Sequence, residues 1–359
     1  MITIKEIAKI ANVSVGTVDR VIHDRDGVSN KTREKVQKIL TEKNFKINNI
    51  ARSLAMKKKY NLSVLMPSFD SNNLFWKSPL LGISKAAEEV LSFGVEVNKY
   101  TFDQLDNKSY FKSFKKLIEV NPEAVILTPL FFNETKKMVN ILDEKKIPYI
   151  FLNIEMNGFN NISFIGQNSY KSGYLSGKLM HLCTEHEANY LITDIESKLY
   201  NNNVIEGRVQ GFKAYFNSNK IPFKTTSLKF EDLKNLDYVK QQLKNVFENH
   251  SNISGILVPS SRISTISSCI NSEKLRTLSL IGFDTTDQNI EYLKNDKITF
   301  LISQKSFNQG FKSVKIMADY LIQNTIPQEK IYSPLEIITK ENLEFSQQEK
   351  WLYIHKKER

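Results

Sequence analysis

Two groups of residues in this chain carry side chains suited to binding chemistry. The first is the stretch 13–23, Val-Ser-Val-Gly-Thr-Val-Asp-Arg-Val-Ile-His, in which small, hydroxylated and basic side chains share one helical segment. Such side chains bind phosphates and base edges and contact thymine methyl groups. The second group consists of polar and aromatic residues that follow short apolar segments between 66 and 304. These residue types can bind a small polar molecule through hydrogen bonds and ring stacking.

The stretch 13–23 has the pattern of the second helix of a helix-turn-helix. Ser14 is a good N-cap residue, and Val18, Val21 and Ile22 recur at helical spacing, which predicts an inward face. The start of a recognition helix is the part that meets DNA. The outward side chains there are Val15, Gly16, Thr17 and Arg20.

The flanking residues predict the rest of a three-helix unit. Thr3 and Glu6 have the spacing of a capping box, Asn12 suits a tight turn, and a third helix is expected from Ser29. The inward residues of the first and third helices are Ile4, Ile7, Ala8, Ala11, Val36, Ile39 and Leu40. The alternative, a small bundle with a merely basic surface, does not explain why helix, turn and caps all fall at these spacings.

Charge is distributed unevenly along the chain. The formal net charge of the whole chain is +11. Residues 1–60 contain 14 Lys and Arg and 6 Asp and Glu, and the rest of the chain contains 36 Lys and Arg and 33 Asp and Glu. A basic module joined to a nearly neutral body indicates a polyanionic partner.

The sequence lacks the motifs of common catalysts. It contains no HExxH, no GxSxG, no phosphate-binding glycine loop with Lys and no metal-spaced His pair. No catalytic residue, metal site or cofactor is expected, and His23, His181, His186, His250 and His355 are scattered. No apolar run reaches the roughly 18 residues of a membrane span, and the N-terminus is patterned as a folded module instead of a signal peptide. A cytoplasmic, nucleoid-associated protein without a membrane partner is therefore expected.

From about residue 61 the chain alternates between strands and helices, which predicts parallel sheets covered on both faces. The expected strands are 62–66, 95–100, 124–128, 149–152, 190–193, 255–258, 278–281, 299–302 and 335–338. The helices expected between them include 81–91, 110–120, 173–182, 204–216, 239–247 and 307–322.

Ligands of such sheets bind outside the carboxyl ends of the strands. In this chain these ends carry alternately aromatic and hydrogen-bonding residues, which predicts a cleft for a small polar ligand. The residues concerned are Asn72, Phe75, Trp76, Phe131, Phe132, Asn153, Glu155, Ser260, Ser261, Arg262, Asp284 and Gln304. Asn168 is a further ligand-binding candidate.

Residues 2–60 resemble the DNA-binding headpiece of the lactose-repressor (LacI-type) family of bacterial transcription regulators. The matching stretches are 3–8, 13–21, 28–29, 32–33 and 50–55, and Asp19 departs from them because the family usually has Ser there. A carboxylate near phosphates is unfavourable unless it pairs, with Arg20 or Arg25 as the available partners. The DNA-binding residues that follow are Thr3, Ser14, Val15, Gly16, Thr17, Arg20, Ser29, Asn49, Arg52, Leu54 and Ala55.

The segment 46–60 resembles the family's hinge. Asn48 and Asn49 can cap a short helix over 50–56, which is marginal in water alone. By the resemblance, Leu54 is a minor-groove wedge that kinks the duplex. The alternative is an ordinary flexible basic linker.

Residues 61–340 resemble the family's effector domain, a type I periplasmic-binding-protein fold with two α/β lobes joined by three crossovers. The resemblance implies that Arg208, Asp284 and Gln304 bind the ligand and that Phe75 and Trp76 flank a sugar ring. Ser260-Ser261-Arg262 departs from the family's frequent Asn or Asp, so the identity of the ligand does not transfer.

The expected architecture is an all-α helix-turn-helix headpiece followed by an α/β effector domain with two doubly wound parallel-sheet lobes. The expected boundaries are 1–46 for the DNA-binding domain, 47–60 for the hinge or linker, 61–340 for the two-lobed domain and 341–359 for a C-terminal tail. Within the two-lobed domain, the N-lobe is expected over 61–165 and 305–326 and the C-lobe over 166–304 and 327–340.

The favoured function is ligand-controlled, sequence-specific repression by a homodimer that binds a pseudo-palindromic operator in double-stranded DNA. The expected effector is a sugar or sugar-like polyol, with a nucleoside or other small polar metabolite as the alternative. A sugar-binding transport or sensory receptor and an enzyme on an α/β scaffold are the competing functions. The sequence leaves open whether the effector releases the protein from DNA or recruits it.

Overall fold

The structure is a computed structural model that describes residues 2–22, 26–43, 45, 59–70, 74–185, 188–195 and 203–346. It divides into two compact units, Met1–Met56 and Lys57–Arg359. The first unit contains the three predicted helices, which are α1 (Ile4–Ala11), α2 (Val15–Ile22) and α3 (Asn30–Glu42). Their apolar faces enclose a small core of Ile7, Ala8, Ala11, Val18, Val21 and Val36.

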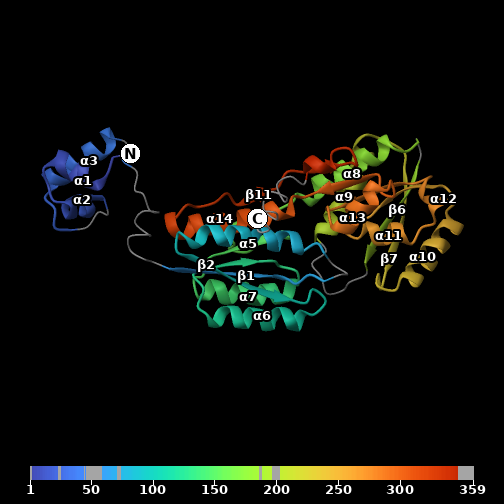
Figure 1. Cartoon of the computed structure of the whole chain (residues 1–359), viewed down its shortest axis with the longest axis horizontal. Helices are drawn as coiled ribbons and strands as arrows, with labels where there is room; N and C mark the ends of the chain where they lie inside the picture. The colour runs from blue at the N-terminus through green and yellow to red at the C-terminus, as the bar shows by residue number, and fades with distance from the viewer. Residues whose placement is uncertain are drawn as a thin grey trace, which may run out of the picture. The chain divides into compact units, whose positions relative to one another are not determined.

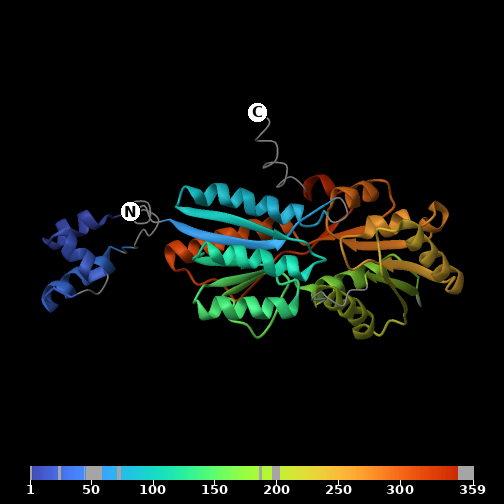
Figure 2. The same ribbon diagram turned by 90° about the horizontal axis from the view of Figure 1, so that it is seen from below.

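The second unit contains two six-stranded sheets in separate lobes (Figure 2). The first sheet has the order β11-β5-β4-β3-β1-β2 and is parallel throughout. Its strands are β1 (Tyr60–Pro67), β2 (Val95–Phe102), β3 (Ala124–Leu127), β4 (Tyr149–Asn153), β5 (Ser163–Gly166) and β11 (Lys330–Tyr332).

Helices cover both faces of this first sheet, as the apolar runs of its strands require. One face packs against α5 (Lys77–Leu91) and α14 (Ser306–Gln323), and the other against α6 (Asn107–Glu119) and α7 (Phe132–Glu144) (Figure 1). In β1, Val64 belongs to the core on the first face and Leu65 to the core on the second, so alternate side chains supply two separate cores.

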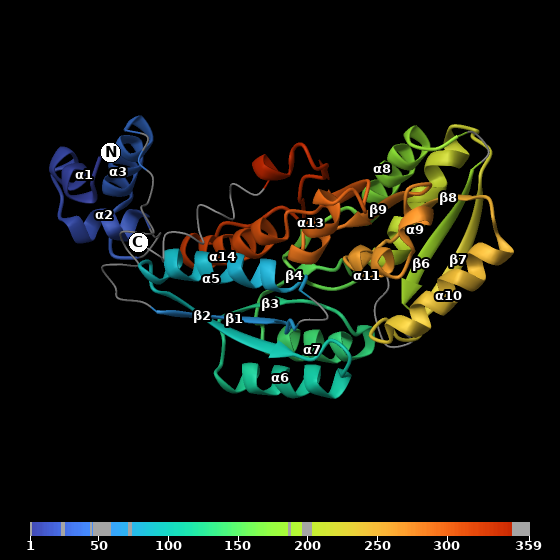
Figure 3. The same ribbon diagram turned by 45° about the vertical axis from the view of Figure 1, so that its right-hand side comes forward.

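The second sheet has the order β12-β10-β9-β8-β6-β7. Its strands are β6 (Asn189–Ile195), β7 (Lys224–Phe230), β8 (Ile253–Leu257), β9 (Ser279–Phe283), β10 (Phe300–Ser303) and β12 (Glu336–Ile338). One face packs against α8 (Ser169–Leu182) and α9 (Asn203–Ser218). The other face is covered by α10 (Leu236–Asn249), α11 (Ile263–Ser268) and α13 (Asp287–Lys294) (Figure 3), together with the short α12 (Ser272–Leu275).

Glycines allow α8 and α9 to approach closely. A Cβ atom on Gly173 of α8 would lie 1.9 Å from the Arg208 carbonyl oxygen of α9, and one on Gly211 of α9 would lie 2.0 Å from the Tyr170 carbonyl oxygen of α8. No other residue fits at either position without moving a helix, so these two glycines set the position of the segment that carries Arg208.

The structure adds elements that the sequence pattern did not predict and corrects two expectations. Strands β5, β7 and β11 were not predicted, and helices α7, α11, α12 and α13 lie outside the helical segments named from the sequence. β12 runs antiparallel to β10, so the second sheet is not wholly parallel. β11 pairs with β5, which places residues 330–332 in the N-lobe sheet and contradicts the expected assignment of 327–340 to the C-lobe.

Candidate functional site

Local hydrogen bonds fix the ends of the first two helices in the headpiece. The predicted capping box is confirmed, because Glu6 Oε2 accepts from the Thr3 backbone N–H at 2.7 Å and Thr3 Oγ1 accepts from the Glu6 N–H at 3.3 Å. The bond from the Thr3 backbone N–H, together with one that the Thr3 hydroxyl donates to Glu6 Oε2 at 2.9 Å, lowers the pKa of Glu6 below its ordinary value. Asn12 ends α1 in the left-handed conformation, with φ 54°, and Ser14 Oγ accepts from the Thr17 N–H at 3.0 Å to begin α2.

The outward face of α2 carries side chains that the headpiece does not need for its own packing. Val15 is 46% exposed, although it is an apolar β-branched residue, and Gly16 and Arg20 are exposed as well. A Cβ atom on Gly16 would have no neighbour closer than Ser14 Oγ at 3.8 Å, so packing within the unit does not require glycine there. This face therefore offers a methyl contact, a close-approach position and a cation at the start of one helix.

Three crossovers join the two lobes of the second unit, at 167–168, 304–305 and 333–335. They lead from β5 to α8, from β10 to α14 and from β11 to β12. Gln167 and Gln304 lie on the first two crossovers, and both are buried. The Gln304 side chain bonds to residues of both lobes, and the Gln167 side chain accepts a hydrogen bond from Arg208 of the C-lobe, as described below.

Asp284 lies directly after β9 and is 6% exposed. Its backbone adopts φ 70°, and its Oδ1 atom accepts a hydrogen bond from Gln304 Nε2 at 2.9 Å. The fully buried Asn289 of α13 donates from Nδ2 to the carbonyl oxygens of Asp284 at 3.0 Å, Phe283 at 3.1 Å and Ser261 at 2.9 Å. The loops after β8 and β9 are thereby tied together, and the Asp284 carboxylate is held in one place.

A relay of amides connects Gln304 to the N-lobe. Asn153, at the end of β4 with φ 70°, donates from Nδ2 to Gln304 Oε1 at 3.0 Å and to Gln309 Oε1 at 3.1 Å. Gln309 Nε2 donates to the Gln304 carbonyl oxygen at 2.8 Å. Because the Gln304 side-chain oxygen faces the Asn153 donor, its NH₂ group is directed at Asp284. The relay therefore links the ends of β4, β9 and β10 across the two lobes.

Arg208 of α9 is a buried cation, 2% exposed. Its guanidinium lies 3.7 Å from the centre of the Phe283 ring and donates to the Pro259 carbonyl oxygen at 2.9 Å and to Gln167 Oε1 at 2.8 Å. Burial lowers its pKa to about 10, and the charge of Asp284 opposes this shift. Arg208 is therefore protonated at neutral pH. Its contacts with Pro259 and Gln167 place the guanidinium where strands of both lobes end.

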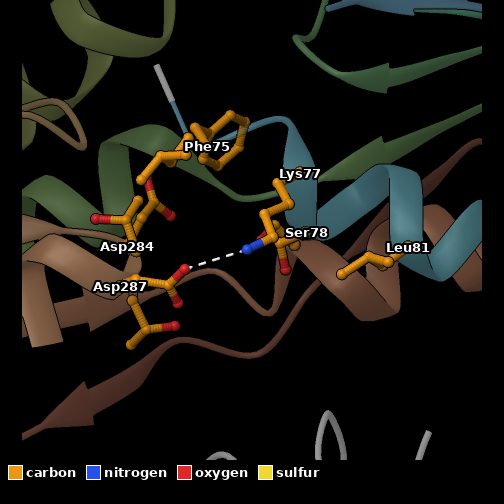
Figure 4. Close-up of a pocket in the computed structure, with 10 residues that line it drawn as sticks. Phe75, Lys77, Ser78, Leu81, Asp284 and Asp287 are labelled. Atoms are coloured by element: carbon orange, nitrogen blue, oxygen red, sulfur yellow. Dashed lines mark hydrogen bonds and ion pairs between the residues drawn. The ribbon is translucent and has the colours of Figure 1, made fainter. Parts of the chain in front are cut away.

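A pocket opens beside Asp284, between the start of α5 and the start of α13 (Figure 4). Phe75 and Ser78 line it from the N-lobe, and Thr285 and Thr286 line it from the C-lobe. At its rim, Lys77 Nζ and Asp287 Oδ2 form an ion pair of 3.2 Å that joins the lobes. The pair is largely exposed, so it contributes little to stability. Because both side chains are already hydrated, the paired and the open arrangement differ little in free energy, and the pair can open and close.

The predicted ligand-binding residues fall into three groups. Asp284, Arg208, Gln304, Asn153 and Phe75 lie where the lobes meet, as described above. Trp76 packs into the N-lobe core with its ring centre 4.8 Å from that of Phe75, Asn168 caps α8 by accepting from the Lys171 N–H at 2.9 Å, and Ser261 is half-buried. Asn72 lies outside the described residues, and so do four predicted DNA-binding residues of the hinge, Asn49, Arg52, Leu54 and Ala55.

Some expectations about the strand ends were wrong, and some residues were missed. Phe131 is fully buried in the N-lobe core instead of facing a cleft, while Phe132 is 50% exposed. Gln167, Asn289 and Gln309 were not predicted, and no local pattern marks them. Only the position of Gln167 directly after a strand could have suggested it, and that strand, β5, was itself missed.

Among the described residues, no cluster of His, Cys, Asp or Glu could hold a metal ion. In the same part of the chain, no helix combines the length and apolar character that a membrane span needs.

Comparison with known proteins identifies both units. Residues 3–48 match the model of bacterial regulatory proteins of the lacI family, and residues 63–325 match the model of a periplasmic binding protein domain. The ribose operon repressor of Lactococcus lactis is 25% identical over 352 residues, covering 96% of this chain and 98% of the repressor. The regulator MalR of Staphylococcus xylosus is 42% identical over 86 residues, covering 23% of this chain and 26% of MalR.

Solved structures agree with this assignment. A structure assigned as a LacI transcriptional regulator from Bacteroides fragilis superimposes with a TM-score of 0.73 and 26% identity, covering 80% of this chain and 99% of its own. GanP, a glucose-galactose binding protein from Geobacillus stearothermophilus, shares the fold with a TM-score of 0.69 at 20% identity, covering 80% and 99%. This chain therefore belongs to the lacI family of bacterial regulatory proteins and consists of a helix-turn-helix headpiece followed by a periplasmic binding protein domain.

Proposed function

We propose that this protein is a sequence-specific transcriptional repressor whose affinity for its operator is set by a sugar or sugar-like polyol bound between the two lobes. The proposal depends on two features that occur in one chain. One is an outward-facing recognition helix, and the other is an interlobe site with the buried carboxylate of Asp284 and the buried guanidinium of Arg208. A transport receptor needs only the second of these. The ribose operon repressor, which aligns over nearly its whole length, supports the pairing of the two.

The chemistry of the cleft favours a neutral polyhydroxylated effector. Asp284 can accept hydrogen bonds from hydroxyl groups, Arg208 can donate to oxygen atoms, and Phe75 offers an apolar surface to a ring face. The opposite charges of Asp284 and Arg208 balance, so no charge on the ligand is required. A nucleoside satisfies part of this set and is the second candidate.

The protein acts as a homodimer in this proposal. One headpiece reads only a few base pairs, and two headpieces on a pseudo-palindrome multiply the specificity. Closure of the lobes on the effector shifts the two N-lobes of the dimer and changes how the paired hinge segments dock on DNA. The effector shifts this balance only by its differential affinity for the two states.

A single experiment tests the proposal. Fragments of the host genome are selected for binding to the full-length protein, and the affinity of the enriched sequence is measured with and without a panel of D-ribose, D-glucose, D-galactose and nucleosides. We expect binding to a two-fold symmetric sequence that weakens with salt and that changes in the presence of one panel member. Retention of sugar binding without any sequence-selective DNA binding would favour the receptor function instead.

A further inference from the structure

Two adjacent buried hydrogen-bond donors, both within the described part of the chain, have no partner. They are Nε2 of Gln167 and Nε of Arg208, and the two residues are 5% and 2% exposed. Buried donors are rarely left unpaired in folded proteins. Since these two belong to side chains that touch each other, one explanation should serve both.

The contact between the two side chains fixes which way the amide faces. Arg208 Nη2 donates to Gln167 Oε1 at 2.8 Å. The amide oxygen is therefore committed to Arg208, and the NH₂ group is directed away from it. An exchange of the two amide ends would place NH₂ against a guanidinium, which only donates.

Both donors lie where the lobes join. Gln167 follows β5 directly and begins the first crossover. Arg208 packs on Phe283, the last residue of β9, and donates to Pro259, just after β8. The charge of Asp284 acts on Arg208 at this place, so an acceptor of ligand hydroxyl hydrogens is also near.

We propose that Gln167 is a further effector-binding residue, and that its Nε2 and the Nε of Arg208 donate to oxygen atoms of the effector whose hydroxyl hydrogens bind Asp284. This inference rests on the function proposed above and adds a requirement to it. The effector must present oxygen atoms that accept from these donors, together with hydroxyl groups that donate to a carboxylate. Adjacent hydroxyls of a sugar ring meet both demands, because each hydroxyl accepts and donates.

The substitution Gln167→Glu separates this role from a purely structural one. Glutamate has the same length and keeps an oxygen for Arg208, and the attraction to the guanidinium opposes the cost of burying the new charge, so the protein without effector should still fold. However, the Nε2 donor of Gln167 is replaced by a carboxylate oxygen, which can only accept and which would face the oxygen atoms of the ligand. We expect the Kd of the effector to rise by about tenfold or more, because the lost hydrogen bond is replaced by repulsion.

The measurement uses full-length protein, the sugar panel named above, thermal unfolding and calorimetric titration. Gln210→Glu is the control, because Gln210 lies exposed on the same helix as Arg208 and gains the same charge. Gln167→Met is a second variant that removes both amide functions without adding charge. Support for the proposal is weaker sugar binding by Gln167→Glu and Gln167→Met, with Gln210→Glu like the wild type.

Any other outcome excludes either the role of Gln167 or the proposed sugar binding. Equal sugar affinity of wild type and Gln167→Glu overturns the inference and leaves the proposed function standing, with a bound water as the partner of the donors. If Gln167→Glu does not fold, unchanged affinity of Gln167→Met has the same meaning. If no sugar of the panel binds the wild type, the sugar-binding role fails, and operator binding in the same preparation decides separately about DNA recognition.

Discussion

Replacing Asp284 should weaken the response to the effector, or abolish it in the case of alanine, without removing operator binding, and asparagine is the informative substitution. Asp284 has φ 70°, a conformation that asparagine adopts more readily than most residues. In Asp284→Asn the side chain would keep an oxygen for Gln304 Nε2, which donates to Asp284 Oδ1 at 2.9 Å in the wild type. Only the negative charge and one acceptor are lost, so the fold and the amide relay should persist.

The size of the effect follows from the lost bond. A hydrogen bond to a charged group contributes about 1.5–3 kcal/mol, which corresponds to roughly a ten- to hundredfold rise in the effector Kd. Asp284→Ala should lose more. It leaves the buried Gln304 donor without its acceptor, at about 1–3 kcal/mol of unfolding free energy, and it places alanine in the left-handed region, at about 1–2 kcal/mol.

Fluorescence anisotropy of labelled operator DNA measures both quantities in one titration. Operator affinity without effector should be equal in the wild type and Asp284→Asn, and the effector concentration at half response should rise in the variant. Asp284→Ala should bind operator and show no response, with a lower melting temperature. A full response of both variants at the wild-type effector concentration would refute the placement of Asp284 in the effector site.

Three further predictions concern the recognition helix, the hinge and the helix pair that carries Arg208. Arg20→Ala should weaken operator binding by about 1–3 kcal/mol if Arg20 contacts a base edge, and an unchanged operator Kd in a gel-shift titration would exclude that contact. Leu54→Ala, at a position outside the described residues, should reduce operator binding far more than binding to random DNA, whereas equal losses would indicate a simple linker. Gly173→Ala should force α8 and α9 apart, because its Cβ would lie 1.9 Å from the Arg208 carbonyl oxygen. We expect a loss of about 1–3 kcal/mol in unfolding free energy together with weaker effector binding, while Gly16→Ala, with an open Cβ position, serves as the control that should leave effector binding unchanged.

Much of this protein could be predicted from its sequence because the relevant signals are local. The capping box of Thr3 and Glu6 and the inward spacing of Val18 and Val21 determine the headpiece within a few residues of chain. The apolar runs of β1 and β3 mark strands that are buried on both faces. Asp284 and Gln304 could be placed near each other because parallel strands end at the same edge of a sheet.

Strands without such a signal were missed for a physical reason. β7, with the sequence KTTSLKF, lies at the edge of its sheet and is largely exposed or half-buried along its length, so it carries no apolar run. β5 (SFIG) and β11 (KIY) each contain only two apolar residues, whereas the equally short β3 (AVIL), which was predicted, is apolar throughout. Their pairing depends on the sheet already being formed.

Amphipathic segments, the location of the positive charge and the side chains that follow the strands can all be recognised in the amino-acid sequence. Which of those side chains meet depends on how the chain packs in three dimensions. Phe131 and Phe75 both follow a strand, yet packing puts the first inside the N-lobe core and the second beside Asp284. Gln167 meets Arg208 41 residues away, and Asn153 meets Gln309 156 residues away. Such contacts depend on how two sheets and three crossovers are placed in space, and no local spacing encodes that placement.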